Sequence, residues 1–299
     1  MTDPLSRSGI VVVDKPLAMT SHDVVARLRK IFGTRKVGHA GTLDPMATGV
    51  LVAGIERGTK LLAHLVADDK VYESTIRLGA ATDTDDADGT VLSTAPTGQV
   101  TDAQIASGIA ALTGEILQVP AAVSAIKIHG RRAHELARAG EEVKIPPRRV
   151  TVESFDLLDT RRAPDGGFID LDVRVHCSSG TYIRSLARDL GAQLGVGGHV
   201  LALRRLRSGP FDISQARRLE ELEQQPRLSL GMDETLVAGW PVLEVSQKEF
   251  DALAMGKWLA PRGLRGVHAA QGPDGRVVAL VKEQGKRLAT VFVARPSTL

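Results

Sequence analysis

The spacing of apolar residues predicts both strands and helices in this chain. Residues 169–175 carry an apolar side chain at every second position, and residues 71–78 repeat the pattern with Tyr72 on the apolar side. A period of two is typical of a strand with one buried face. The continuous apolar run at residues 9–13 predicts a further, fully buried strand.

Helical spacing appears in three other segments. Ser21 is expected to cap a helix over residues 22–32, and Thr101 with Gln104 predicts a second helix that begins with a capping box. A third helix is expected after Gly180. Strands and helices follow one another without a regular βαβ rhythm, so we expect an α+β fold on a mixed, mainly antiparallel sheet.

The pattern changes near the C-terminus. Residues 219–239 are polar and weakly patterned, which is typical of a last helix and a linker. Beyond them, short alternating strands flank two turn signals, at residues 273–275 and 284–285. We therefore expect a large domain at residues 1–235 and a small β-rich domain at residues 240–299.

Composition excludes several classes of protein. Of the 299 residues, 43% are hydrophobic and 24% charged, as in ordinary globular proteins. The chain has no apolar stretch of about 18 residues and no apolar signal core at its start, so we expect a cytoplasmic protein outside the membrane. The single cysteine, Cys177, excludes an internal disulfide and a multi-cysteine zinc site, and we expect it to be a small core residue.

Charge is distributed unevenly along the chain. The formal net charge is only +3, yet basic residues cluster around residues 27–36, 127–149 and 204–218. Each cluster alone could be an ordinary solvated surface. Three clusters together favour a polyanionic partner such as nucleic acid.

The segment Gly38–Gly49 is the strongest candidate for a functional loop. Its three glycines permit tight turns or a close approach to a ligand, and Pro45 keeps Asp44 out of the helical region. Asp44 is therefore presented on a rigid turn. Spacing alone also allows a simpler interpretation, in which Asp44 only caps a turn.

This loop resembles the catalytic loop of the TruB family of pseudouridine synthases, whose pattern is G-H-x-G-x-L-D-P-x-A-T-G. Other stretches are similar to the same family in the same order: Asp14-Lys15-Pro16, Lys70-Val71-Tyr72, Gly180 to Arg184 and Leu203-Arg204-Arg205. The resemblance covers roughly residues 9–215 and implies the fold and activity of that family.

The resemblance implies a role for each matching residue. Asp44 is implied to be the nucleophile, Arg184 its ion-pair partner, and Tyr72 the aromatic residue that stacks on the base. Substrate-binding positions are implied for His39, Tyr182, Leu203 and Lys15. Implied RNA contacts are Lys127, Arg131, Arg132, Arg138, Arg148, Arg149, Arg204 and Arg205. No cofactor and no metal are implied, because the substrate undergoes an isomerisation without redox change.

The implied substrate is the T stem-loop of tRNA, in which one uridine, at position 55, is flipped out and converted to pseudouridine. Residues 124–150 resemble a thumb-like insertion that grips the RNA, with a short helix at 131–140, and residues 240–299 resemble a PUA-like β-barrel. A monomer without an obligatory protein partner is expected. Two alternatives stay open: a guide-RNA-directed pseudouridine synthase, and a non-catalytic RNA-binding or tRNA-folding module. Whether Asp44 bonds covalently or acts by elimination also stays open.

The acidic segment Asp83–Gly89 superficially resembles a calcium loop. With Gly89 at the loop glycine, Thr84 takes the first ligand position and Ala95 stands where a bidentate glutamate belongs. The histidines show no metal-ligand spacing either. We expect an acidic turn between two elements and no metal site.

Overall fold

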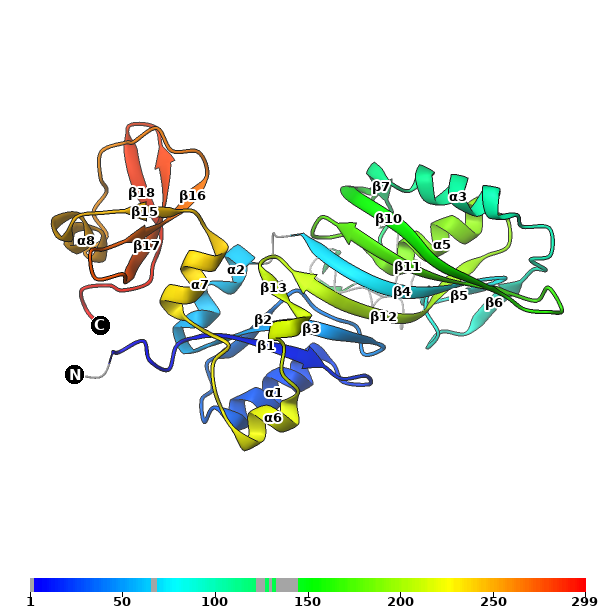
Figure 1. Cartoon of the computed structure of the whole chain (residues 1–299), viewed down its shortest axis with the longest axis horizontal. Coiled ribbons are helices and arrows are strands. Elements are labelled where there is room, and N and C mark those ends of the chain that lie inside the picture. The colour runs from blue at the N-terminus through cyan, green and yellow to red at the C-terminus, as the bar shows by residue number, and fades with distance from the viewer. Residues whose placement is uncertain (1–2, 66–68, 122–126, 129–130, 133–144) are drawn as a thin grey trace. The chain divides into compact units, whose positions relative to one another are not determined.

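The computed structural model describes residues 3–65, 69–121, 127–128, 131–132 and 145–299. Contacts divide the chain into two compact units. The first unit comprises Met1–Leu43, Val50–Val66 and Gly209–Leu299, and the second comprises Asp44–Gly49 and Ala67–Ser208. Each unit is described by itself below, with the elements labelled in Figure 1.

The second unit is built on an antiparallel sheet. Its strands follow the order β12 (Gly198–Ser208), β4 (Lys70–Leu78), β11 (Ile169–Cys177), β10 (Arg148–Arg162) and β7 (Gly114–Gln118). All four pairings between these neighbours are antiparallel. The first residues of β3 (Ala47–Ile55) add a parallel contact to β12. The expected α+β fold on a mixed, mainly antiparallel sheet is therefore confirmed.

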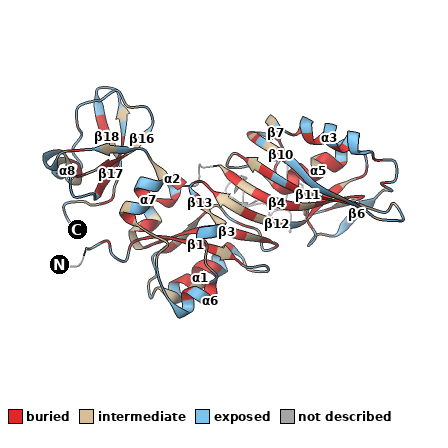
Figure 2. Ribbon diagram, in the orientation of Figure 1, coloured by how far each residue is buried: buried red, intermediate tan, exposed pale blue. Residues whose placement is uncertain are grey.

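The two faces of β4 differ as the sequence pattern predicts. Tyr72, Ser74, Ile76 and Leu78 are buried, whereas the residues between them are half-buried (Figure 2). Helix α5 (Ile183–Gln193) packs against β12 and β4, and α3 (Asp102–Ala111) packs against α5 and β10. On the other face, cross-strand ion pairs such as Arg77–Asp170 join β4 to β11. The face with the helices thus forms the core of this unit.

Two expected helix starts can be compared with the structure. Thr101 caps α3 and forms the predicted capping box with Gln104. The prediction for Ser21 is wrong, because Thr20 is the N-cap of α1 (Ser21–Ile31) and forms a capping box with Asp23. Ser21 is the first helical residue, and its hydroxyl has another function, described below.

Two short hairpins complete the described part of the second unit. One pairs β5 (Ala80–Thr82) with β6 (Val91–Thr94), and the other pairs β8 (Lys127–Ile128) with β9 (Arg131–Arg132). Residues 131–132 are therefore in a strand, not in the helix expected at 131–140. Positions 133–140 of that expected helix lie outside the described residues.

The first unit surrounds a second group of strands. Strand β1 (Gly9–Lys15) lies between β14 (Leu230–Gly231) and β3, and β2 (Val37–Ala40) pairs with β3. The helical elements of this part are α1, η1 (Glu56–Lys60), α2 (Leu62–Leu65), η2 (Ile213–Gln215), α6 (Leu219–Gln224) and α7 (Met232–Gly239), and β13 (Phe211–Asp212) precedes η2. Residues 219–239, expected to be one helix and a linker, thus form two short helices separated by β14.

The expected C-terminal β domain is confirmed as a four-stranded sheet. Its strands run in the order β15 (Val242–Glu244), β16 (Val267–Gln271), β17 (Val277–Gln284) and β18 (Arg287–Val293), with α8 (Gln247–Ala254) beside them. The two predicted turns join β16 to β17 and β17 to β18. One apolar cluster lies within this sheet and α8, and a second extends to β1, β3 and α7.

Candidate active site

The glycine-rich segment is shorter as a loop than the sequence indicates. Residues 38–40 belong to β2 and residues 47–49 to β3, so only residues 41–46 connect the two strands. Asp44 begins a tight turn in this connection, because its carbonyl accepts a hydrogen bond from the N–H of Ala47 across 3.0 Å. Pro45 occupies the second position of the turn, where its fixed φ is favourable. The backbone at Asp44 is thereby fixed.

The residue before Asp44 is held by a buried hydroxyl. Oγ of Ser21 accepts from the N–H of Leu43 across 2.9 Å and donates to the carbonyl of the same residue across 3.1 Å. Ser21 is only 1% exposed. Both backbone groups of Leu43 are thus satisfied by one side chain from α1, which explains why a serine stands at this position.

Gly49 allows the other end of the loop to lie against β12. Its φ is +98°, and a Cβ at this position would lie 2.2 Å from the carbonyl oxygen of Arg205. Residues 47–49 pair in parallel with residues 203–205. A side chain at Gly49 would push these two strands apart and displace the Asp44 turn.

The carboxylate of Asp44 pairs with Arg184. The distance from Oδ2 of Asp44 to Nη2 of Arg184 is 2.9 Å, and the two side chains are 37% and 5% exposed. The cation is therefore buried, while the anion is partly exposed to solvent. A charge-assisted pair of this kind holds the carboxylate ionised and oriented.

Arg184 is held by the acidic segment that resembles a calcium loop. Its Nη1 donates to the carbonyl of Thr84 across 2.8 Å and lies 3.4 Å from Oδ2 of Asp86, whose side chain is 7% exposed. The hydroxyl of Thr84 also donates to Asp86. Sequence reasoning predicted an acidic turn at this segment but missed this role. The only signal was the unusual density of carboxylates in one short turn.

Tyr72 lies on the buried face of β4 beside Arg205. The two residues are register partners across β4 and β12, and Tyr72 is 8% exposed. Burial raises the pKa of the Tyr72 phenol, and the hydrogen bond and positive charge of Arg205 partly oppose that rise. The negative charge of Asp44 adds to the increase in the pKa of Tyr72, which is consistent with its nearness to this ring.

The placement of Arg205 differs from expectation. We expected an RNA contact on the surface, but Arg205 is 1% exposed and is among the largest fully buried side chains. Its neighbour Arg204 is half-buried and donates to the hydroxyl of Thr48 across 3.3 Å. The alternation of a strand sends these two adjacent arginines to opposite faces. Arg205 therefore supports Tyr72 within the sheet.

Tyr182 and Leu203 lie on elements that also carry the central residues. Tyr182 is the N-cap of α5 and is half-buried, two residues before Arg184. Leu203 is 8% exposed and is the register partner of Ala47, close in the chain to Asp44. The second unit thus brings together Asp44, Arg184 and Tyr72, with Leu203 in the strand that receives the end of the loop.

Lys15 and His39 belong to the first unit. Lys15 is fully buried, and its ammonium donates to the carbonyls of Pro16 and Met19 across 2.9 and 2.6 Å. It therefore stabilises the turn before α1. The ring of His39 on β2 packs edge to face with His22, at 5.5 Å between ring centroids.

The basic residues expected to contact RNA lie in several places. Arg148 and Arg149 are exposed at the start of β10. Lys127, Arg131 and Arg132 belong to the β8–β9 hairpin, and Arg138 lies outside the described residues.

Within the described ranges, no group of three or more histidine, cysteine or acidic side chains could hold a metal ion. Among the helices of those ranges, none is long and apolar enough to cross a membrane. Cys177 is fully buried, as expected, and burial raises the pKa of its thiol to about 11.

The arrangement suits nucleophilic or acid–base chemistry at one carboxylate. Asp44 is partly exposed, and its charge is balanced by a fixed arginine. An aromatic ring and an apolar side chain lie on β4 and β12. Such a site can present an ionised carboxylate to an uncharged, flat substrate.

Family models match nearly the whole chain. Residues 29–183 match "TruB family pseudouridylate synthase (N terminal domain)", and residues 184–238 match "tRNA pseudouridylate synthase B C-terminal domain". Residues 240–295 match "tRNA Pseudouridine synthase II, C terminal".

Individual relatives and solved structures agree with these matches. The chain is 67% identical over 299 residues to a Corynebacterium aurimucosum protein and 62% identical over 302 residues to a Corynebacterium diphtheriae protein, with 100% of each chain covered. Both are named tRNA pseudouridine synthase B. A chain of an H/ACA RNP bound to a substrate RNA has a TM-score of 0.72 at 25% identity, over 98% of this chain and 86% of its own. A chain of a Cbf5-Nop10-Gar1 complex has the same TM-score and identity, over 98% and 87%.

Proposed function

Because this chain belongs to the TruB family of pseudouridylate synthases, we propose that it converts the T-loop uridine at position 55 of tRNA to pseudouridine without a cofactor. Asp44 acts at the ribose of this uridine, and the N1–C1′ bond breaks. The uracil stays in the site, turns, and forms a new bond from C5 to C1′. The proton on C5 leaves, and N1 becomes protonated.

One observation carries this proposal, namely the unequal burial of the Asp44–Arg184 pair. The arginine is 5% exposed and the carboxylate 37%, at a distance of 2.9 Å. A nucleophilic carboxylate has to remain ionised after a base enters the site and removes water, which desolvation opposes. A buried, prepositioned cation opposes this cost while the carboxylate itself stays partly exposed.

The neighbouring residues fit the other demands of the reaction. A base that leaves the RNA stack loses stacking energy, and an aromatic face can replace it. Tyr72 provides that face, and the positions of Tyr182 and Leu203 are consistent with the wall of the base pocket. Because burial raises the pKa of the Tyr72 phenol above its ordinary value, the phenol remains protonated at neutral pH.

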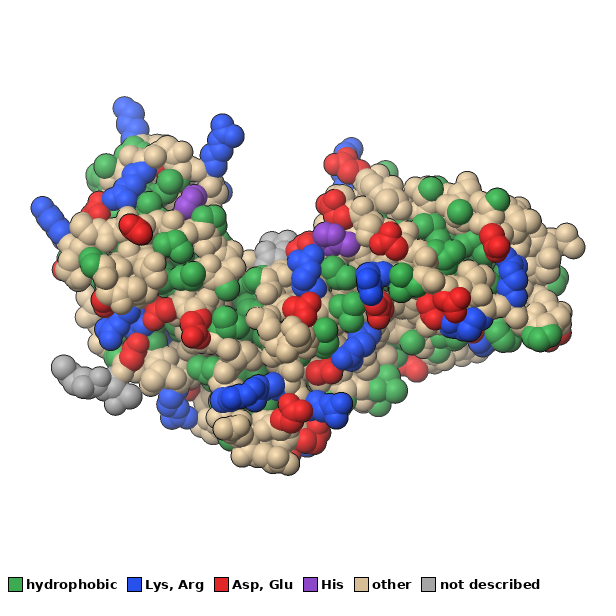
Figure 3. Space-filling model, viewed as in Figure 1, with side chains coloured by type: hydrophobic (Ala, Val, Ile, Leu, Met, Phe, Trp, Pro, Cys, Tyr) green, Lys and Arg blue, Asp and Glu red, His purple; other side chains and the backbone are tan. Residues whose placement is uncertain are grey.

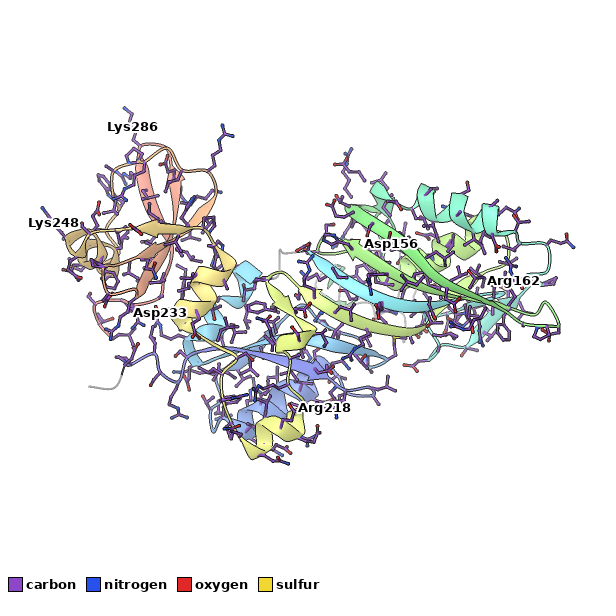
Figure 4. All side chains as sticks on the ribbon, in the orientation of Figure 1. Asp156, Arg162, Arg218, Asp233, Lys248 and Lys286 are labelled. Atoms are coloured by element: carbon purple, nitrogen blue, oxygen red, sulfur yellow. The ribbon has the colours of Figure 1, made fainter. Side chains whose placement is uncertain are left out.

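Binding of the rest of the tRNA is assigned to basic surfaces. Residues 1–235 form the catalytic domain, with an RNA-gripping insertion at 124–150, and residues 240–299 form an RNA-binding domain. Arg148 and Arg149 are exposed where β10 leaves the insertion. The C-terminal segment from residue 240 contains nine basic and five acidic residues, a net +4 by subtraction, against +3 for the whole chain. Figure 3 shows several long basic side chains extending from it, and Lys248 and Lys286 point away from the sheet in Figure 4.

We propose that the protein acts on tRNA as a monomer and without a partner protein. The two structures above come from complexes with partner proteins or RNA, so a guide-RNA-directed enzyme is the main alternative within the family. A tRNA-folding role is compatible with catalysis at Asp44.

The experiment is to incubate the purified protein, free of metal and other proteins, with an unmodified tRNA transcript and to map pseudouridine. Wild type is expected to convert only the T-loop uridine, and Asp44→Asn none. A transcript with cytidine at that position is the matched substrate control. No conversion by wild type, with tight tRNA binding, would indicate a binding module or a partner-dependent enzyme.

A further inference from the structure

Helix α5 carries Arg184 but begins without a cap from its own sequence. Its N-cap residue, Tyr182, makes no side-chain capping hydrogen bond. Gln118, the last residue of β7, instead binds the backbone of Tyr182 itself. Its side-chain amide donates to the carbonyl of Tyr182 across 3.1 Å and accepts from the N–H of the same residue across 2.8 Å.

Gln118 is buried as well as doubly bonded. It is 1% exposed, in a region where each lost hydrogen bond leaves a polar group unsatisfied. The amide therefore fixes the backbone of Tyr182, two residues before Arg184, from a strand that is remote in the sequence.

Arg188 makes a second contact to the same end of β7. Its Nη2 donates to the carbonyl of Val119 across 2.8 Å, directly after Gln118. Arg188 is four residues after Arg184, so both side chains project from the same side of α5. In one contact a side chain of β7, Gln118, binds the backbone at the start of α5. In the other, a side chain of α5, Arg188, binds the backbone just after β7.

Arg188 also joins the turn that holds Arg184. Its Nη1 donates to Asp85 across 3.1 Å. Asp85 is 9% exposed and has a φ of +60°, a strained conformation for a residue other than glycine. The residues on either side, Thr84 and Asp86, are those that contact the guanidinium of Arg184.

We propose that Gln118 and Arg188 are positioning residues for Arg184. Gln118 fixes the start of α5, and Arg188 fixes the helix against both β7 and the Asp85 turn. Together they hold the guanidinium of Arg184 between Asp86 and Asp44. This inference rests on the proposed function, in which Arg184 acts on Asp44.

The physical reason is the precision that the reaction demands. Catalytic groups have to be held within about 0.5 Å of the productive geometry by the residues behind them, and a displacement of about 1 Å can reduce turnover about 100-fold. Gln118 acts through the start of α5, and Arg188 acts through α5 and the Asp85 turn.

The test measures single-turnover pseudouridine formation at saturating tRNA, tRNA affinity and thermal stability for Gln118→Met and Arg188→Met. Methionine keeps much of each side chain's length and volume but removes its hydrogen bonds. We expect each rate to fall by roughly 10- to 100-fold. We expect tRNA affinity to change by less than about twofold, because neither residue is assigned to phosphate binding.

Coupling to Arg184 distinguishes positioning from simple stabilisation. Both substitutions are repeated in Arg184→Lys, which shortens the side chain and removes its fork of donors. If they act through the guanidinium, their additional effect falls below about threefold in this background. Equal fold-losses in both backgrounds would overturn the proposal, as would unchanged rates with a lowered melting temperature.

Arg162→Met is the matched control. Arg162 also donates to one backbone carbonyl, of Val100, and to one carboxylate, of Asp102, but it lies on β10 (Figure 4). The single-turnover rate of Arg162→Met should equal that of wild type. If a methionine variant does not fold, Gln118→Glu and Arg188→Lys keep part of each contact, and the same coupling to Arg184→Lys decides the outcome. Activity of wild type beside an inactive Asp44→Asn variant tests the proposed function separately.

Discussion

Asp86 lies 3.4 Å from Nη1 of Arg184, while Nη2 of the same guanidinium lies 2.9 Å from Asp44. One buried arginine is thus shared by two carboxylates of different exposure, 7% for Asp86 and 37% for Asp44. The buried carboxylate holds the arginine, and the more exposed one is available for chemistry.

Replacing Asp86 tests this division of roles. We expect Asp86→Asn to lower the turnover rate by about tenfold or more and to destabilise the protein by about 1–3 kcal/mol, because Arg184 loses a buried charged partner. Affinity for tRNA should change little. Asp88→Asn, on the exposed side of the same turn, is the matched control and should resemble wild type. If Asp86→Asn turned over as fast as wild type, the Asp86–Arg184 pair would have only a structural role.

Ser21 and Thr20 provide an adjacent pair for comparison. Ser21→Ala removes both hydrogen bonds to Leu43, and we expect a loss of about 1–3 kcal/mol in unfolding free energy together with reduced turnover, since the next residue is Asp44. Thr20→Ala removes the cap of α1, and we expect a loss of about 1 kcal/mol without an effect on saturated turnover. Chemical unfolding and single-turnover kinetics measure the two quantities. Equal kinetic losses in both variants would contradict the role given to Ser21.

The ionisation of Tyr72 should not appear in the activity profile at neutral or moderately alkaline pH. Burial is the largest cause that raises the pKa of this phenol above the ordinary value of 10.0. The profile of single-turnover rate against pH should therefore lack a tyrosine inflection below about pH 10. The chain has only two tyrosines, so the difference in tyrosinate absorbance between wild type and Tyr72→Phe isolates this group. A difference that develops below pH 10 would contradict the buried placement.

Acid should weaken the contact between the N-terminus and the C-terminal β domain. Asp3 accepts from Arg295, which lies just after β18, and this bond is the main cause that lowers the pKa of Asp3 from 3.8 to about 2. The Asp3 carboxylate therefore binds a proton less tightly in the folded state than in the unfolded chain. The stabilisation is therefore complete above pH 3.8 and is lost as the pH falls towards 2. Because the Asp3 carboxylate is partly solvated, we expect this contact to stabilise the folded state by about 1 kcal/mol or less.

Urea unfolding of wild type and Asp3→Asn at several pH values measures this effect. The difference in unfolding free energy between them should be largest near neutral pH and close to zero at pH 2. A difference that stays constant over this range would mean that the Arg295 bond does not favour the ionised form.

The C-terminal domain offers a separate prediction for RNA binding. Trp258 is 53% exposed, and the guanidinium carbon of Arg287 lies 4.8 Å from its ring centroid. An exposed ring with adjacent positive charge can stack on a nucleobase, so Trp258→Ala should weaken tRNA binding about fivefold or more. Turnover at saturating tRNA should not change. Val242→Ala, which shortens another exposed apolar residue of the domain, is the control. Unchanged affinity in Trp258→Ala would remove this surface from the tRNA contact.

Local sequence determined the elements and the identity of the central residues. The period-two pattern of β4 and β11, the Thr101 cap of α3 and the C-terminal hairpins depend on neighbours in the chain, and the structure confirms them. The resemblance of the Asp44 loop to TruB depends on a contiguous motif, which the family matches confirm.

Tertiary structure decided what supports those residues. The partners of Arg184 come from a turn about 100 positions earlier in the chain, and Gln118 binds Tyr182 across 64 positions. Arg205 was expected to contact RNA, because the sequence around it does not show which face of β12 is buried. Ser21 looked like a helix cap because its bonds to Leu43 join segments 22 residues apart. Contacts between distant segments depend on how the strands and helices pack, and no local pattern of side chains records that packing.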